Sequence, residues 1–317
     1  MRVQLPSLAL SLASVLAWHG LRKRSLSPSG AAAAFAVGYT MMSVRLSTFG
    51  VALIVFYLTG SRATKVGKSL KKQLEEGHQD AGYRNAMQVV CNSLSAAIAA
   101  LGWSALYDPH SWVAQALRSL GWDAGLGRHK VEFDIDRWCP LTPPVAASWS
   151  RALVFVTLGH FACCLGDTLA SELGILSRSP PILITTLKRV PPGTNGGLSV
   201  VGTLASVGGG LFMGLTMAVT LIVQSTSCRA QWQHVLFSLV AWGTFAGGFG
   251  SLLDSLLGAT LQRTRYVNTT KRIWTEEAGA LDAKADVKVI SGLDMLTNNQ
   301  VNLLSSVATA VLLGSIA

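Results

Sequence analysis

Residues 198–224 read LSVVGTLASVGGGLFMGLTMAVTLIVQ. This stretch contains no charged side chain, and it exceeds the roughly 20 residues that an α-helix needs to cross the hydrocarbon core of a bilayer. The run Gly208-Gly209-Gly210 and the spacing of Gly210 and Gly214 are typical of membrane helices that pack closely together. The stretch therefore predicts a membrane-spanning helix inside a tightly packed bundle.

The composition of the whole chain agrees with this prediction. Of its 317 residues 50% are hydrophobic and 13% are charged, against about 25% charged residues in an ordinary soluble domain. A mean hydropathy of +0.41 and 31 glycines indicate a polytopic helical membrane protein. The net charge of +10 is therefore taken to report membrane orientation, and no nucleic-acid partner is expected.

Uncharged apolar stretches predict an all-α bundle of about 7–8 transmembrane helices, forming a single transmembrane domain over residues 1–317. The first three stretches are short, which leaves the exact number of crossings open. The stretches are 4–17, 29–44, 46–60, 86–106, 145–165, 198–224, 232–258 and 300–316.

The distribution of Lys and Arg predicts the orientation. With eight crossings, eighteen of the 26 basic residues fall in four loops on one side, which the positive-inside rule places in the cytosol. Both termini and the irregular loop 107–144 are then expected on the lumenal side, and the charged loop 259–299, expected to be partly mobile, on the cytosolic side. The five cysteines form no CxxC pair and no metal-ligand spacing, so neither a disulfide framework nor a zinc site is predicted.

Polar motifs gather at the predicted cytosolic ends of the spans. Asn85, Gln88 and Asn92 follow Arg84 at spacings that put all three amides on one helical face. The alternative for each amide is a hydrogen bond to a neighbouring helix. Lys65 closes the preceding span nearby.

Three carboxylates lie in or beside apolar segments. Asp167 and Glu172 end the fifth span, and Asp254 lies inside the seventh. Such groups are costly at a membrane unless they pair with cations, and Mg²⁺ held by carboxylates and substrate phosphates would suit them. The alternatives are that Asp167 caps a short helix and that Glu172 pairs with a nearby Lys or Arg.

Two further segments reach the same side. Lys188 and Arg189 precede Gly193-Thr194-Asn195-Gly196-Gly197, which is either a backbone nest for phosphate or a plain tight loop. Asp294 and the amides Asn298 and Asn302 open the last span. Together these groups predict a cytosolic pocket that binds a lipid phosphate, with Asp167, Glu172, Asp254 and Asp294 for Mg²⁺, and Lys65, Arg84, Lys188 and Arg189 for phosphates.

The motifs also resemble a known family. The strings GYRNAMQVVCNS (82–93), GDTLASELG (166–174), LITTLKRVPPGTNGG (183–197), GSLLDSLLGATLQ (250–262) and DMLTNNQVNLLSS (294–306) are similar to transmembrane protein 19 and its relatives, including plant phytyl-phosphate kinase. The resemblance covers residues 20–316 and keeps the motif order. In this sequence Thr297 stands where the family pattern has an acidic residue.

The resemblance implies an integral membrane kinase that converts a prenyl monophosphate into its diphosphate with CTP or another nucleoside triphosphate and Mg²⁺. Asp167, Asp254 and Lys188 would be catalytic, with Glu172 or Asp294 as secondary metal ligands. Arg84 and the 193–197 turn would hold phosphates, and Asn85, Asn195 and Asn298 would orient them. The lack of an evident transit peptide favours the endoplasmic reticulum over a plastid. The alternatives are a transporter or flippase for an anionic lipid or small anion, and a non-catalytic membrane scaffold.

Overall fold

Helices form at every predicted apolar stretch. The computed structural model describes residues 5–76, 83–121, 132–143, 149–274 and 286–317. The long helices are α1 (Leu5–Arg22), α2 (Pro28–Met42), α3 (Thr48–Ala63), α6 (Leu94–Tyr107), α8 (Trp149–Gly174), α9 (Val200–Gln224), α11 (Trp232–Leu261) and α12 (Asn298–Ile316). Short helices are α4 (Lys68–Leu74), α5 (Ala86–Cys91), α7 (Trp112–Ser119) and α10 (Thr226–Ala230).

The predicted all-α membrane bundle is confirmed. Within the described residues α8, α9, α11 and α12 are long and apolar enough to cross a membrane, while α3 and α6 are shorter apolar helices. The fourth predicted stretch is not one continuous helix, because α5 ends at Cys91 and α6 begins at Leu94. This break leaves α5 as a separate polar segment beside the bundle.

Side-chain caps fix where several of these helices begin. Ser27 accepts a hydrogen bond from the Gly30 amide at 2.9 Å, and Pro28 supplies the first residue of α2. Ser199 caps α9 in the same way through the Gly202 amide. Thr297 and Gln300 form a reciprocal capping box at the start of α12. Helix starts are therefore set locally by the sequence.

Glycines bring α8, α9 and α11 into backbone contact, as the 208–214 pattern predicts. A Cβ added to Gly247 of α11 would lie 2.7 Å from the Cα of Gly210 on α9. A Cβ added to Gly166 of α8 would lie 2.7 Å from the Gly247 carbonyl oxygen. Since no real Cβ is tolerated at such distances, these three helices form a closely packed unit.

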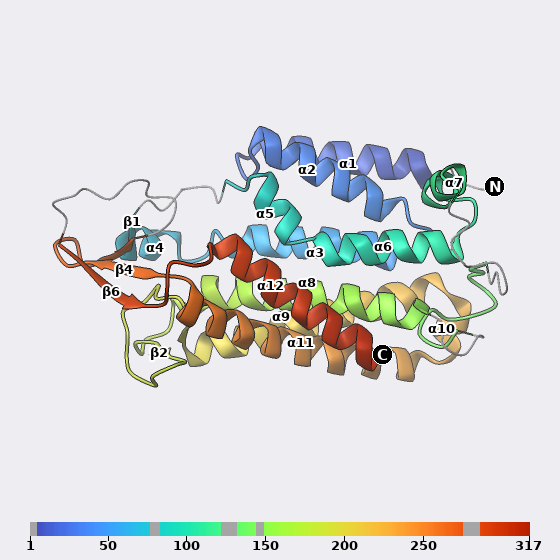
Figure 1. Ribbon diagram of the computed structural model, residues 1–317. Helices are drawn as coiled ribbons and strands as arrows, with labels where there is room; N and C mark the ends of the chain where they lie inside the picture. Colours follow the sequence, from blue (N-terminus) through green and yellow to red (C-terminus); the bar gives the residue numbers. More distant parts are fainter. Residues whose placement is uncertain (1–4, 77–82, 122–131, 144–148, 275–285) are drawn as a thin grey trace.

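The two ends of the bundle differ. Figure 1 shows both chain termini, α7 and α10 toward one end, and the strands and α4 at the other. The charged segment after α11, expected to be a partly mobile loop, contains β4 (Thr264–Val267), β5 (Arg272–Trp274) and β6 (Val287–Ser291). With β1 (Glu75–Glu76) these form a sheet of order β1-β5-β4-β6. Strands this short give no readable alternation in the sequence. A second small sheet pairs β2 (Ile182–Leu183) with β3 (Gly197–Leu198) in antiparallel fashion.

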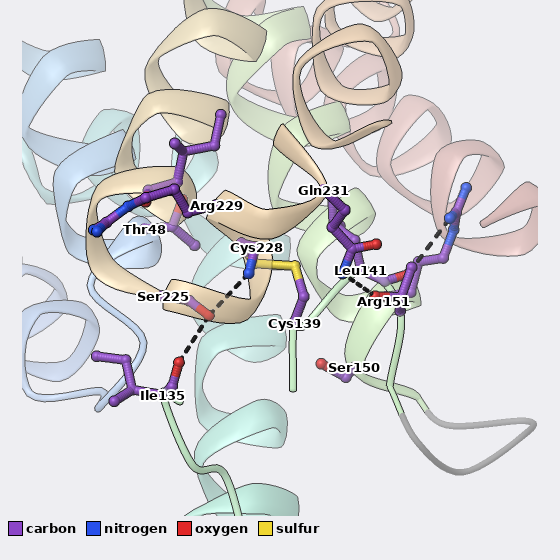
Figure 2. Close-up of a disulfide and its surroundings, with 12 residues drawn as sticks. Thr48, Ile135, Cys139, Leu141, Ser150, Arg151, Ser225, Cys228, Arg229 and Gln231 are labelled. Atoms are coloured by element: carbon purple, nitrogen blue, oxygen red, sulfur yellow. Dashed lines mark hydrogen bonds between the residues drawn. A yellow bond between two sulfur atoms is a disulfide. The ribbon is translucent and has the colours of Figure 1, made fainter. Parts of the chain in front are cut away.

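A disulfide lies at the opposite end from the strands, and here the sequence-based prediction is wrong. Cys139 and Cys228 are bonded although 89 positions separate them, a spacing that carries no signature. Figure 2 shows how the neighbouring segment is held: the Cys228 amide donates to Ser225 Oγ at 3.2 Å, and that hydroxyl donates to the Ile135 carbonyl at 2.9 Å. Disulfides persist in oxidising compartments, so this end fits the predicted lumenal side.

Candidate functional site

A cavity of about 730 Å³ lies between the helices, and several of the predicted polar motifs line it. Residues of α1, α2 and α3 line one part of it, and residues of α5, α8 and α12 line another. Eight predicted site residues are among those that line it: Arg84, Asn85, Gln88, Asn92, Asp167, Glu172, Asn298 and Asn302. The structure therefore brings together groups from three separate sequence motifs.

Arg84 supplies a half-buried cation at this cavity. Its backbone is fixed against the turn before α2, since the Arg84 amide donates to the Ser25 carbonyl at 3.1 Å and the Ser27 amide donates to the Arg84 carbonyl at 2.9 Å. Its Nη1 donates to Ser61 Oγ at 3.1 Å. Burial lowers the pKa of Arg84, and the nearby Tyr57 and Glu172 oppose that shift. A guanidinium keeps its charge in such surroundings and attracts an anion.

The three amides of the 85–92 motif bond mainly within their own segment. Asn85 caps α5, and its side chain and that of Gln88 form a reciprocal capping box. Asn92 Nδ2 donates to the Gln88 carbonyl at 2.7 Å. These contacts fix the side chains at the cavity wall and differ from the helix-to-helix bonds considered as the alternative. The Asn85 and Gln88 spacing is itself a capping-box signal.

Glu172 pairs with a lysine, as one of the two alternatives predicts. Lys71 Nζ lies 2.6 Å from Glu172 Oε2, and the two side chains are 10% and 12% exposed. Lys71 also lines the cavity. Sequence reasoning missed Lys71 as a site residue because it lies in a run of similar lysines on α4, and no spacing distinguishes it from them.

Asp167 and Asp254 are two neighbouring acidic side chains beside this cavity. Asp167 lines the cavity and has a hydrogen bond with Ser251, while Asp254 Oδ2 accepts from Ser305 Oγ at 2.8 Å. The two carboxylates are close enough for their charges to interact. With its amide nitrogen turned inward, Asn302 donates to Asp254 Oδ2 at 3.2 Å and so connects Asp254 to the cavity wall.

The chemistry of this pair fits a cation. In the part of the chain that the structure describes, neither carboxylate has an ion pair, and two neighbouring charges away from water repel one another. The described residues include no group of three or more His, Cys, Asp or Glu side chains that could hold a metal alone. A Mg²⁺ ion here would take its remaining ligands from phosphate oxygens and water, as this ion often does.

Other predicted residues lie away from the cavity wall. Lys65, Lys188 and Arg189 are exposed to solvent. Asp294 forms an ion pair with Arg263, and Arg265 Nη2 lies 3.5 Å from the same carboxylate oxygen. The structure therefore does not bring these groups together with Asp167 and Arg84.

The glycine-rich turn at 193–197 is occupied by its own contacts. Gly193 and Gly196 have φ values of 87° and 76°, which favour glycine. The Gly197 amide donates to the Thr194 carbonyl at 2.9 Å, and the Asn195 amide donates to Thr264 Oγ1 at 3.2 Å. Gly196 also packs directly on Ala259 of α11. These contacts are those of a tight loop, the alternative that the sequence leaves open.

Much of the rest of the cavity wall is apolar, although no sequence motif marks the residues that form it. Ala13 and Leu16 of α1, Val37 and Met42 of α2, and Leu53 of α3 line it. The same space therefore has a charged end and a hydrocarbon end. Such a cavity matches an amphiphile whose head is anionic and whose tail is apolar.

Fold and cavity together define a helical integral membrane protein with an amphiphilic cavity between its helices. Residues 11–310 match the family described as "Integral membrane protein DUF92", and the chain belongs to that family. It is 33% identical over 308 residues to "Protein PGR" of Arabidopsis thaliana, covering 96% of this chain and 93% of that protein.

Two further relatives come from prokaryotes. An uncharacterised membrane protein of Synechocystis is 27% identical over 261 residues, covering 82% of this chain and 79% of that protein. An uncharacterised membrane protein of Methanocaldococcus jannaschii is 37% identical over 160 residues, covering 45% of this chain and 60% of that protein. No solved structure matches the chain.

Proposed function

We propose that this protein is a membrane kinase that converts a prenyl monophosphate into its diphosphate, with a nucleoside triphosphate, CTP by preference, and Mg²⁺. The observation that carries the proposal is the single cavity in which Arg84, Lys71 and Asp167 meet at one end and apolar residues of α1, α2 and α3 continue at the other. The likeness of the quoted motifs to a prenyl-phosphate kinase family supports the reaction and the donor.

The residues take different parts in this proposal. Asp167 and Asp254 would hold Mg²⁺, and the ion would supply positive charge beside the transferred phosphoryl group. Arg84 binds the phosphate of the lipid, while the Lys71–Glu172 pair holds α4 against α8 beside it. Asn85, Asn298 and Asn302 orient phosphate oxygens through their amides.

The transfer needs little acid–base help from the protein. An ionised oxygen of the lipid monophosphate attacks the γ-phosphorus of the nucleotide, the new P–O bond forms, and the bond from the γ-phosphorus to its bridging oxygen breaks. The nucleoside diphosphate leaves with the bonding electrons, and no proton is removed from the attacking group. Positioning and charge neutralisation therefore dominate catalysis.

The proposed location is the endoplasmic reticulum, with the cavity open to the cytosol. The Cys139–Cys228 disulfide lies at the end away from the strands, which supports a lumenal position for that end. Cytosolic nucleotide would then reach the end of the bundle that carries Arg84 and Asp167.

The proposal is tested by a product screen. Purified protein in lipid nanodiscs is incubated with phytyl, farnesyl or geranylgeranyl monophosphate, each with CTP, UTP or ATP and Mg²⁺. Mass spectrometry should detect the corresponding lipid diphosphate, and chelation of Mg²⁺ should prevent its formation. If the protein binds the lipid phosphates but forms no diphosphate with any nucleotide, the kinase assignment is wrong and a transporter or scaffold role gains support.

A further inference from the structure

The apolar part of the cavity runs along almost the whole of α2. Ser27, immediately before the helix, and Met42, its last residue, both line the cavity. Between them, Ala34, Val37 and Gly38 line it as well. Opposite, the lining runs from Thr64, just after α3, at the polar end to Leu53 of α3 at the apolar end. The cavity is thus an elongated channel whose polar end lies near Ser27.

The length of this channel can be compared with that of a lipid tail. Ser27 and Met42 are fifteen positions apart, which at 1.5 Å per position gives roughly 22 Å. An extended chain advances about 1.2 Å per bond, so roughly 18 bonds fit, including those of the phosphate head. A twenty-carbon isoprenoid, with about sixteen carbons along its backbone, would reach Met42, whereas a fifteen-carbon one with about twelve would stop short.

Gly38 borders the cavity near the apolar end of the channel, close to Met42. A Cβ added at Gly38 would lie 3.4 Å from the terminal methyl of Met42 and 3.7 Å from the Cβ of Ala13, with no backbone atom nearby. Gly30, on the same helix, is different: a Cβ there would collide with the Arg84 carbonyl. Gly30 therefore serves backbone packing, whereas Gly38 borders open channel and a flexible methionine.

We infer that Gly38 and Met42 form the floor of a tail channel and set the length of isoprenoid tail that the protein accepts, with a twenty-carbon tail preferred over a fifteen-carbon one. This inference rests on the proposed function, because the tail belongs to the lipid phosphate whose head lies at Arg84. Two features identify the occupant. The channel is continuous with the half-buried guanidinium of Arg84, and the length of the channel matches a twenty-carbon tail.

The test measures binding and turnover separately for farnesyl and geranylgeranyl monophosphate. In Gly38→Leu the new side chain should fill the floor of the channel, so the affinity for the longer lipid should fall about tenfold while that for the shorter changes less than about threefold. Ala36→Leu is the matched control, because Ala36 is exposed on the same helix. It should leave both affinities unchanged.

Met42→Ala tests the floor in the opposite direction. Removal of its side chain should improve the affinity for a twenty-five-carbon monophosphate about tenfold relative to the fifteen-carbon one. This variant decides the question if Gly38→Leu does not fold, as judged by size-exclusion chromatography and thermal unfolding.

The outcomes separate the two proposals. Equal effects on both lipids, or no effect in either floor variant, would overturn the length assignment even if the wild type makes diphosphate. A length shift in binding without any diphosphate formation would support the channel and overturn the kinase. Failure of the wild type to bind any prenyl monophosphate would overturn both.

Discussion

The helices α8, α9 and α11 differ sharply from α1, α2 and α3 in how they use small residues. In the first group glycines such as Gly210 and Gly247 allow the helix backbones to touch. In the second group Gly38 and Ala13 border a cavity of about 730 Å³. Figure 1 shows α1 and α2 on one side of the bundle and α9 and α11 on the other, with α3 and α8 between them. Glycines thus bring backbones together in the first group, whereas in the second group Gly30 does so and Gly38 borders the ligand space.

The largest effect is expected from substitution within the closely packed half. Gly210→Val would place a side chain against the backbone of Gly243 and Gly247, so folded protein should be lost or destabilised by more than about 3 kcal/mol. Gly208 lies on the same helix with nothing within 4 Å of its added Cβ, and Gly208→Val is the control. Yield and thermal unfolding in detergent measure both. Equal stability of the two variants would contradict the packing account.

A smaller effect is expected from the buried ion pair that joins α4 to α8. Lys71→Met leaves Glu172 buried without its cation and should cost about 3 kcal/mol in unfolding free energy. The double variant Lys71→Met/Glu172→Leu should recover most of that loss, because no charge is then stranded. If the double variant is as unstable as the single one, the pair does not hold the cavity wall.

The disulfide should matter least to the cavity. Cys139→Ser should lower the thermal stability, by about 2–4 kcal/mol in unfolding free energy, while the turnover of lipid phosphate stays within about twofold of the wild type. Loss of turnover beyond about twofold would contradict the account, because the disulfide would then shape the cavity.

Periodicity and charge predict much of the fold. All eight helical stretches follow from uncharged runs, and Gly210 with Gly214 predicts the close packing. The convergence of Arg84, Asp167 and Asn302 on one cavity follows from placing each motif at the same end of its span. The helices and the glycine contacts follow from local sequence. The shared end of the motifs depends only on the number of membrane crossings.

Other features depend on contacts that the sequence does not encode in any short pattern. The Cys139–Cys228 bond needs a loop to fold back onto α10, and the Lys71–Glu172 pair singles out one lysine from a run of four. Asp294 and the 193–197 turn carry suitable chemistry, but Arg263 and the backbone of α11 engage them. Residue type therefore predicts candidates for the site, and tertiary packing selects among them.

The most direct measurement of the central claim is phosphoryl transfer from γ-labelled CTP to geranylgeranyl monophosphate by three proteins in nanodiscs. The wild type and Asp286→Asn, which alters an exposed acid near the strands, should transfer label at similar rates. Asp167→Asn should fold and insert normally but lose at least about 100-fold in rate, because it removes a charge that holds Mg²⁺. Transfer by Asp167→Asn at the wild-type rate would contradict the account.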